Sequence, residues 1–110
     1  MNPVKLIRLA KEAMQHAYTP YSDFKVGAAL LTAAGKVYQG CNIENAAYSP
    51  SNCAERTAFF KAIYEGERNF AAIAVVGGKN GVVGDIFPPC GVCRQVMQEF
   101  CGPDFMIYMG

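Results

Sequence analysis

The feature that most constrains the fold of this 110-residue chain is a set of three cysteines, one near its middle and two toward its end. Cys53 belongs to the run Cys-Ala-Glu-Arg, and Cys90 and Cys93 belong to the run Pro-Cys-Gly-Val-Cys-Arg. Thiolates hold Zn²⁺ in tetrahedral geometry, and a catalytic zinc takes three protein ligands and keeps one position open. The spacing therefore predicts a catalytic zinc site that joins two segments far apart in the sequence.

Helix-start signals accompany both thiol segments. The run Ser-Pro-Ser-Asn at 49–52 precedes a predicted helix over 54–64, and Pro89 precedes a predicted helix over 90–100. The partial positive charge of a helix N-terminus favours thiolate over thiol. Two helix N-termini are therefore predicted to converge on the metal.

One acid and two arginines lie beside the thiols. Residues two apart in a helix point in different directions, so Cys53 and Glu55 share a site only if it lies off the helix end. Three thiolates leave a bound Zn²⁺ with net negative charge, which weakens it as a Lewis acid. Arg56 and Arg94 are predicted to offset that charge and so to tune the metal.

Each of these signals has a plainer interpretation when it is taken alone. A single Cys-x-x-Cys motif is typical of redox chemistry or of a structural zinc, for which Cys41 or Cys101 could supply a fourth ligand. Glu55 alone is also typical of a solvated helix residue. His16, the only histidine, has no partner signature and is predicted to be a surface or packed side chain. The combination of motifs favours the catalytic site.

With these motifs the chain resembles the small cytidine deaminases whose zinc is held by three cysteines. The resemblance covers nearly the whole chain, through Pro-Tyr-Ser at 20–22, Phe-Lys-Val-Gly-Ala-Ala-Leu at 24–30, Gly-Cys-Asn-Ile-Glu-Asn-Ala-Ala-Tyr at 40–48, Cys-Ala-Glu-Arg-Thr-Ala at 53–58 and Pro-Cys-Gly-Val-Cys-Arg-Gln at 89–95. It implies a Zn²⁺ hydrolase of pyrimidine salvage that converts cytidine or deoxycytidine to the uridine analogue and ammonia.

The resemblance also implies how the reaction proceeds. Zinc bound by Cys53, Cys90 and Cys93 lowers the pKa of water to around neutral. Glu55 takes the proton to the ring nitrogen N3, hydroxide attacks C4, and Glu55 then passes a proton to the departing amine.

The substrate-binding residues follow from the same resemblance. Asn42 and Glu44 hold the ribose hydroxyls; the plainer interpretation of these residues is turn chemistry. Further roles are implied for Phe24 (packing beside the nucleoside), Ala54 (backbone contacts to the pyrimidine), and Ala46 and Tyr48 (reaching a neighbouring subunit's site in a homotetramer). Glu44 would repel a phosphate on the sugar, so the expected substrate is a nucleoside and not a nucleotide.

One departure from the family pattern and two rival functions remain. Relatives continue past the last predicted strand into a tail with an aromatic residue that covers the base. This sequence ends at Gly110, either because the native protein is short or because the sequence is a piece of a longer chain. The alternatives are a deaminase of a nucleoside antibiotic such as blasticidin S and a non-catalytic module stapled by zinc.

Composition narrows the class further. Hydrophobic residues make up 52% of the chain and charged residues 17%, which is typical of one globular domain over 1–110. A net charge of +1 without a basic stripe argues against nucleic-acid binding, and no apolar run approaches the ~20 residues of a membrane span. Five cysteines, an odd number, favour a reducing, cytoplasmic setting over a disulfide scaffold.

The predicted order of elements indicates a three-layer α/β/α sandwich with a mixed β-sheet. Helices are predicted over 3–17, 54–64 and 90–100, and strands over 24–32, 37–41, 70–76 and 104–108, with a glycine-rich loop over 77–84. The first two strands form an antiparallel hairpin. The apolar stripe of the first helix is predicted as Val4, Ile7, Ala10, Met14 and Ala17, and the inward face of the second as Ala58, Phe59, Ala62 and Ile63.

Overall fold

A computed structural model describes residues 2–20, 24–43, 54–79 and 105–109. Its elements are α1 (Pro3–Met14), β1 (Phe24–Thr32), β2 (Val37–Cys41), α2 (Ala54–Tyr64), β3 (Phe70–Lys79) and β4 (Met106–Met109). The sheet order is β2-β1-β3-β4, in which β1 is antiparallel to both of its neighbours and β4 is parallel to β3. The predicted mixed sheet and its opening hairpin are confirmed.

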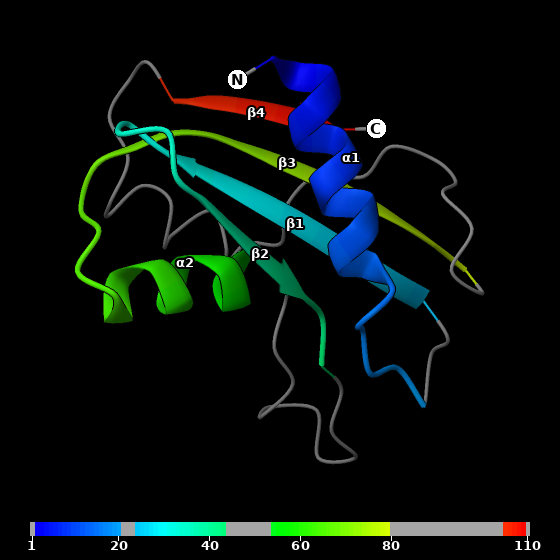
Figure 1. The fold of residues 1–110 in the computed structure, drawn as a ribbon. Coiled ribbons are helices and arrows are strands. Elements are labelled where there is room, and N and C mark those ends of the chain that lie inside the picture. Colours follow the sequence, from blue (N-terminus) through cyan, green and yellow to red (C-terminus); the bar gives the residue numbers. More distant parts are fainter. Residues whose placement is uncertain (1, 21–23, 44–53, 80–104, 110) are drawn as a thin grey trace.

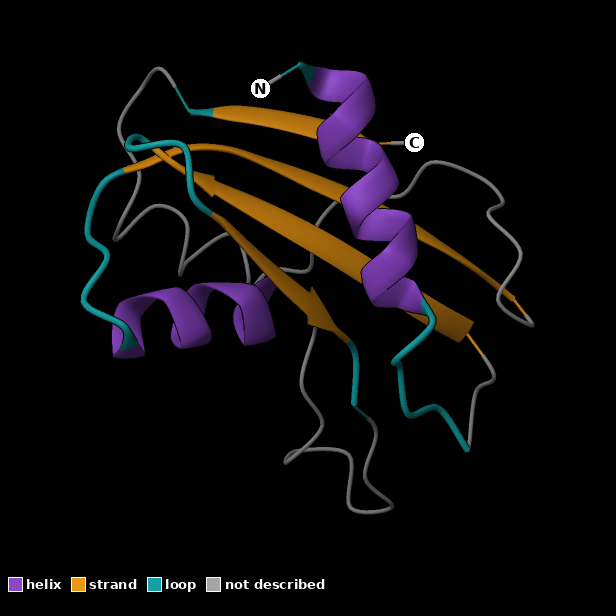
Figure 2. Ribbon diagram, in the orientation of Figure 1, coloured by secondary structure: helices purple, strands orange, loops and turns teal. Residues whose placement is uncertain are grey.

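The two described helices cover opposite faces of the sheet (Figures 1 and 2). Alternate residues of a strand point to opposite faces, and β1 divides its side chains in this way. Val26, Ala28 and Leu30 join the core beneath α2, whereas Ala29 and Leu31 join the core beneath α1. This arrangement confirms the three-layer α/β/α fold.

The first helix is shorter than predicted, and its buried stripe is different. The Asn2 side chain caps α1 by accepting a hydrogen bond from Lys5 N at 2.8 Å, and the helix ends at Met14, so Ala17 lies beyond it. Val4, predicted to be buried, is 69% exposed. The buried residues are Leu6, Ala10, Ala13 and Met14. Their spacing of i, i+4, i+7 and i+8 describes one helix face, and Val4 lies off that face.

The third strand is longer than predicted, because Gly77 and Gly78 belong to β3 and not to a loop. They pair with Val26 and Lys25 of β1. A long neighbouring strand supplies ladder partners for these backbone groups, and this tertiary pairing overrides the weak strand propensity of glycine. At the end of the chain, β4 begins at Met106, and the predicted helix over 90–100 lies outside the described residues.

The inward face of α2 agrees with the prediction. Ala58, Phe59 and Ala62 are fully buried, and Ile63 packs against the same core from a partly buried position. The ring of Phe59 lies 5.2 Å from that of Phe70, in an edge-to-face arrangement that aromatic pairs prefer. The second helix is therefore seated firmly on the sheet.

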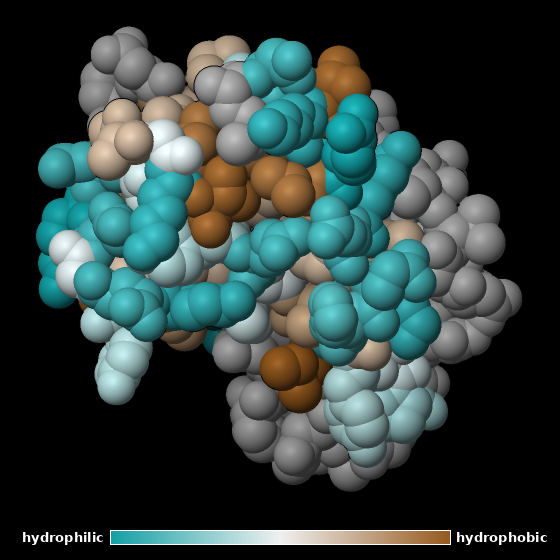
Figure 3. All heavy atoms as spheres, in the orientation of Figure 1, coloured by the Kyte–Doolittle hydropathy of each residue, from teal (hydrophilic) through white to brown (hydrophobic). Residues whose placement is uncertain are grey.

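The surface seen from the side of α1 is mostly hydrophilic, and hydrophobic side chains gather beside α1 over the sheet (Figure 3). Partly buried residues of the α1 core contribute apolar surface around the helix, namely Ile7, Leu9, Leu31, Val37 and Tyr108. Within the described part of the chain, neither helix is long and apolar enough to cross a membrane.

Candidate active site

The described part of the predicted site is built around Asn42, which follows β2 directly. Asn42 is half-buried, and its backbone N–H donates to Val26 O at 3.2 Å. Its side-chain Oδ1 accepts a hydrogen bond from Val26 N at 2.9 Å. Two bonds to one residue of β1 fix both the backbone and the side-chain orientation of Asn42.

A second segment holds Asn42 from the side of α1. The backbone N–H of Tyr18 donates to Asn42 O at 3.0 Å, and Tyr18 forms a parallel bridge with Ile43. Residues that follow α1 therefore line up beside the end of β2. Asn42 lies where β1, β2 and this segment meet.

The N-terminal half of α2 is set against the same end of β2. Thr57 Oγ1 donates to Cys41 O at 3.1 Å. At Gly40, an added Cβ would lie 2.6 Å from Ala58 N and would also collide with Ala54 O, so the helix backbone rests directly on the strand. Ala54, the first residue of α2, is fully buried. The first turns of this helix are thus held against Gly40 and Cys41, which directly precede Asn42.

The predicted site residues are described to different extents. Asn42, Ala54 and the half-buried Arg56 are described with their side chains, whereas Phe24 and Glu55 are described by backbone position only, at the start of β1 and in the first turn of α2. The remaining predicted residues lie outside the described part of the chain, namely Glu44, Ala46, Tyr48, Cys53, Cys90, Cys93 and Arg94.

The described start of α2 suits the predicted zinc site. Because the helix begins at Ala54, Cys53 immediately precedes its first residue, where unpaired N–H groups and the helix dipole favour a thiolate. Over residues 2–20, 24–43, 54–79 and 105–109, no group of three His, Cys, Asp or Glu side chains could hold a metal. The predicted zinc ligands all lie outside those ranges.

A cavity of about 250 Å³ lies beside this site at the outer side of β2. Its lining residues are Ala13, His16, Gln39, Gly40, Cys41, Thr57 and Lys61. Cys41 is half-buried. Burial raises the pKa of its thiol, and the charge of Lys61 opposes that rise. His16 is exposed, in agreement with the prediction of a surface or packed histidine.

Sequence reasoning missed the residues that hold Asn42 in place. Val26 and Tyr18 act through their backbone amides, and backbone groups carry no residue-specific signal. Thr57 acts through a hydroxyl in the first turns of a helix, where threonine commonly satisfies nearby backbone groups. The glycine at 40, inside a predicted strand, was the one available sign of a close backbone approach.

Comparison with known proteins defines first the class of this chain, a zinc-binding deaminase. Residues 2–109 match the family described as the cytidine and deoxycytidylate deaminase zinc-binding region. A cytidine deaminase from Sporosarcina psychrophila is 55% identical over 109 residues, which are 99% of this chain and 77% of the relative. The chain belongs to the cytidine and deoxycytidylate deaminase family.

Solved structures agree with this assignment. The crystal structure of cytidine deaminase from Burkholderia pseudomallei has a TM-score of 0.84 and 56% identity, covering 91% of this chain and 77% of that one. Cytidine deaminase from Mycobacterium tuberculosis has a TM-score of 0.86 at 39% identity, covering 97% of this chain and 84% of that one. The three-layer fold is therefore the fold of solved cytidine deaminases.

Proposed function

We propose that this protein catalyses the zinc-dependent hydrolysis of cytidine or deoxycytidine to uridine or deoxyuridine and ammonia, in pyrimidine salvage. The observation that carries the proposal is the packing of Gly40 and Cys41, the residues of β2 just before Asn42, against the first turns of α2, in a chain 55% identical to a cytidine deaminase. A residue suited to bind sugar hydroxyls therefore follows directly on the strand end that contacts a helix start suited to hold a zinc thiolate.

The chemistry is assigned to residues at the start of α2 and at the start of the helix predicted over 90–100. Cys53, Cys90 and Cys93 would hold Zn²⁺, which when bound acidifies water and so supplies a nucleophile near neutral pH. Glu55, in the first turn of α2, would carry a proton to ring N3 and later one to the departing amine. Arg56, half-buried two residues into the same helix, would offset thiolate charge, and Arg94 would do the same beside Cys93.

Recognition of the nucleoside is assigned to the end of β2 and its surroundings. Asn42 and Glu44 would bind the sugar hydroxyls, with Phe24 beside the nucleoside and the backbone of Ala54 at the pyrimidine. The burial of Ala54 supports a backbone role, because its methyl group has no access to solvent. A carboxylate at Glu44 would repel a sugar phosphate, which favours nucleosides over nucleotides.

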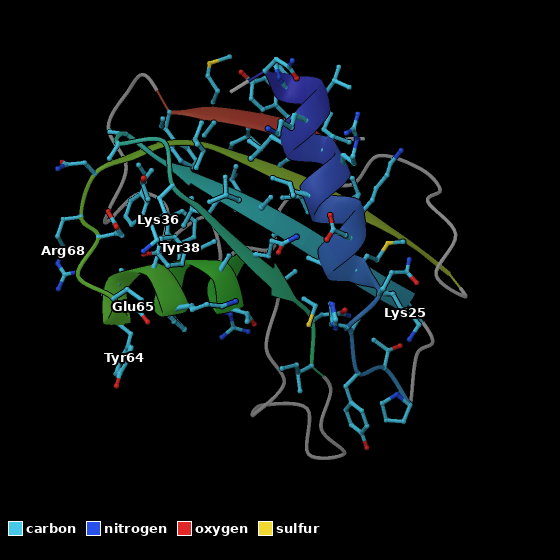
Figure 4. The ribbon with its side chains drawn as sticks, viewed as in Figure 1. Lys25, Lys36, Tyr38, Tyr64, Glu65 and Arg68 are labelled. Atoms are coloured by element: carbon cyan, nitrogen blue, oxygen red, sulfur yellow. The ribbon has the colours of Figure 1, made fainter. Side chains whose placement is uncertain are left out.

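The assembly is proposed to be a cytoplasmic homotetramer in which Ala46 and Tyr48 reach a neighbouring site. Support comes from α2, where Phe60 is 47% exposed and Tyr64 is 89% exposed. Residues four apart share one helix face, and Figure 4 shows Tyr64 pointing away from the helix. Exposed apolar surface of this kind is typical of a contact with another subunit. Sedimentation as an active monomer would contradict shared sites.

The decisive experiment compares wild-type protein with Glu55→Gln, using the loss of cytidine absorbance and the zinc content. A general acid–base group is worth about 10²–10⁴ in rate, and this one acts at more than one step, so the loss is expected at or above the upper end. Zinc content and thermal stability should stay near wild type, because no thiolate is altered. Glu12→Gln, an exposed carboxylate on α1, is the matched control and should be fully active.

Three results would contradict the proposal. Normal deamination by Glu55→Gln would remove the proton carrier from the mechanism. Loss of zinc in Glu55→Gln would make the carboxylate a ligand. A zinc-loaded wild-type protein with no turnover of cytidine would indicate a non-catalytic module, or an antibiotic deaminase if blasticidin S is consumed instead.

A further inference from the structure

The segment that follows α1 is tied to the site at more than one point. Tyr18 holds Asn42 through a backbone hydrogen bond of 3.0 Å and pairs with Ile43 as a parallel bridge. Thr19, the next residue, is a polar side chain that is only 7% exposed. The position of this segment therefore decides whether Tyr18 can hold Asn42.

The side chain of Lys25 fastens this segment to the sheet. Its Nζ donates to Thr19 Oγ1 at 3.3 Å and to Ala17 O at 3.5 Å. These two acceptors flank Tyr18 in the sequence. Figure 4 shows Lys25 at the start of β1, next to the chain that leaves α1. The half-buried ammonium group therefore bridges both sides of the residue that holds Asn42.

Two adjacent residues of β1, Lys25 and Val26, both contribute to holding Asn42 in place. Val26 binds Asn42 through its N–H and C=O, while Lys25 binds the segment that carries Tyr18. Neighbouring strand residues point to opposite faces of a sheet. The two residues thus hold Asn42 through separate contacts, one by its own backbone and one through the segment beside it.

We propose that Lys25 is a positioning residue for sugar recognition, which acts by keeping Tyr18 against the main-chain carbonyl of Asn42 and so keeping in place the backbone from which the Asn42 side chain projects. The inference rests on the proposed function. Because Val26 still holds Asn42 when Lys25 is lost, the site should loosen and the fold should persist. Lys25 is not assigned any contact with substrate.

The test uses Lys25→Met, which keeps the length of the aliphatic chain and removes the charged donor. With cytidine, KM should rise about 10-fold, because a hydrogen bond to a charged group is worth about that factor or more in affinity. The kcat for cytidine should change less than about 2-fold, because Lys25 takes no part in the chemical step. With 2′,3′-dideoxycytidine, which lacks the hydroxyls that Asn42 would bind, KM should be the same for variant and wild type. A merely structural role would alter both substrates alike.

Two further variants sharpen the result. Lys25→Arg keeps a cationic donor and should restore most of the affinity for cytidine. Lys11→Met removes an exposed lysine of α1 and controls for the loss of charge alone. In an Asn42→Ala background, Lys25→Met should have little additional effect on KM, because both changes act through the same side chain.

The possible results distinguish a failure of the Lys25 role from a failure of the proposed deaminase function. A wild-type protein without cytidine turnover overturns the proposed function and this inference with it. An active wild type with unchanged KM in Lys25→Met, or with equal KM changes for both substrates, overturns the positioning role alone. An effect that is fully additive with Asn42→Ala also overturns it.

Discussion

Substitution of Gly40 by alanine should damage both the stability and the activity of this protein. An added Cβ would lie 2.6 Å from Ala58 N and 3.1 Å from Ala58 Cα, whereas ordinary contact begins at 3.4 Å. The neighbouring atoms belong to helix backbone, so no side chain can rotate to make room. Relief requires α2 to move away from β2 by at least 0.8 Å, the difference between 2.6 and 3.4 Å for Ala58 N, and by more for Ala54 O, which lies nearer to the added Cβ.

The expected loss of stability in Gly40→Ala follows from that displacement of α2. Overpacking of a filled interior typically costs about 1–3 kcal/mol, and the backbone clash places Gly40→Ala near the upper end. Alanine also lowers the conformational entropy of the unfolded chain, which offsets about 0.4–1 kcal/mol of this loss of stability. A net loss of about 2 kcal/mol corresponds to a fall in Tm of about 10 °C for a domain of this size.

Activity should fall as well, because the displaced helix begins at the site. Ala54 starts α2, Cys53 precedes it and Glu55 follows it. A misplacement of ~1 Å can cost about 10²-fold in rate, and kcat/KM measured on folded, zinc-loaded Gly40→Ala should fall by roughly that factor.

Gly35→Ala is the matched control, and urea unfolding with steady-state kinetics is the assay. Gly35 has φ +93° with no atom within 4 Å of an added Cβ, so alanine there introduces backbone strain of about 1–2 kcal/mol and no clash. That variant should lose stability and keep its activity. A Gly40→Ala protein with wild-type stability and kinetics would refute the close approach of α2 to β2.

Further predictions concern the core, pH and the metal. Phe59→Ala, which removes a fully buried ring in contact with the rings of Phe70 and Phe105, should lower the free energy of unfolding by about 3–5 kcal/mol in urea titrations. Burial raises the pKa of the Cys41 thiol above its ordinary 9.0, so the folded state holds that proton more tightly than the unfolded chain. Its contribution to stability is then present below pH 9.0 and is lost as pH rises through the folded pKa, and the difference in unfolding free energy between wild type and Cys41→Ala should shift against the wild type between pH 8 and 10. Parallel pH profiles would contradict this. Cys90→Ser should lower zinc content, measured by metal analysis, together with Tm, and a stable, fully loaded variant would exclude Cys90 as a ligand.

The sequence by itself determined the elements and the chemistry to look for. An apolar run, the short glycine-containing link after it and helix-start signals are local patterns, and they placed β1, β2 and α2 at their observed bounds. The inward face of α2 was predicted for the same reason. The motifs around Cys53 and Cys90 depend on residue type and spacing, which are also readable without coordinates. Family membership confirms the zinc-binding class that those motifs predicted.

Only the tertiary structure decided which segments meet at Asn42. The contacts that hold it come from backbone groups of Val26 and Tyr18, and every residue except proline offers the same groups. Backbone pairing also explains why β3 includes two glycines, because its hydrogen bonds to β1 depend on register and not on side chains. The role of Lys25 likewise depends on the position of its Nζ in the folded protein, which the sequence does not reveal. Spacing along a sequence predicts neighbours within one element, whereas contacts between elements follow from how those elements pack.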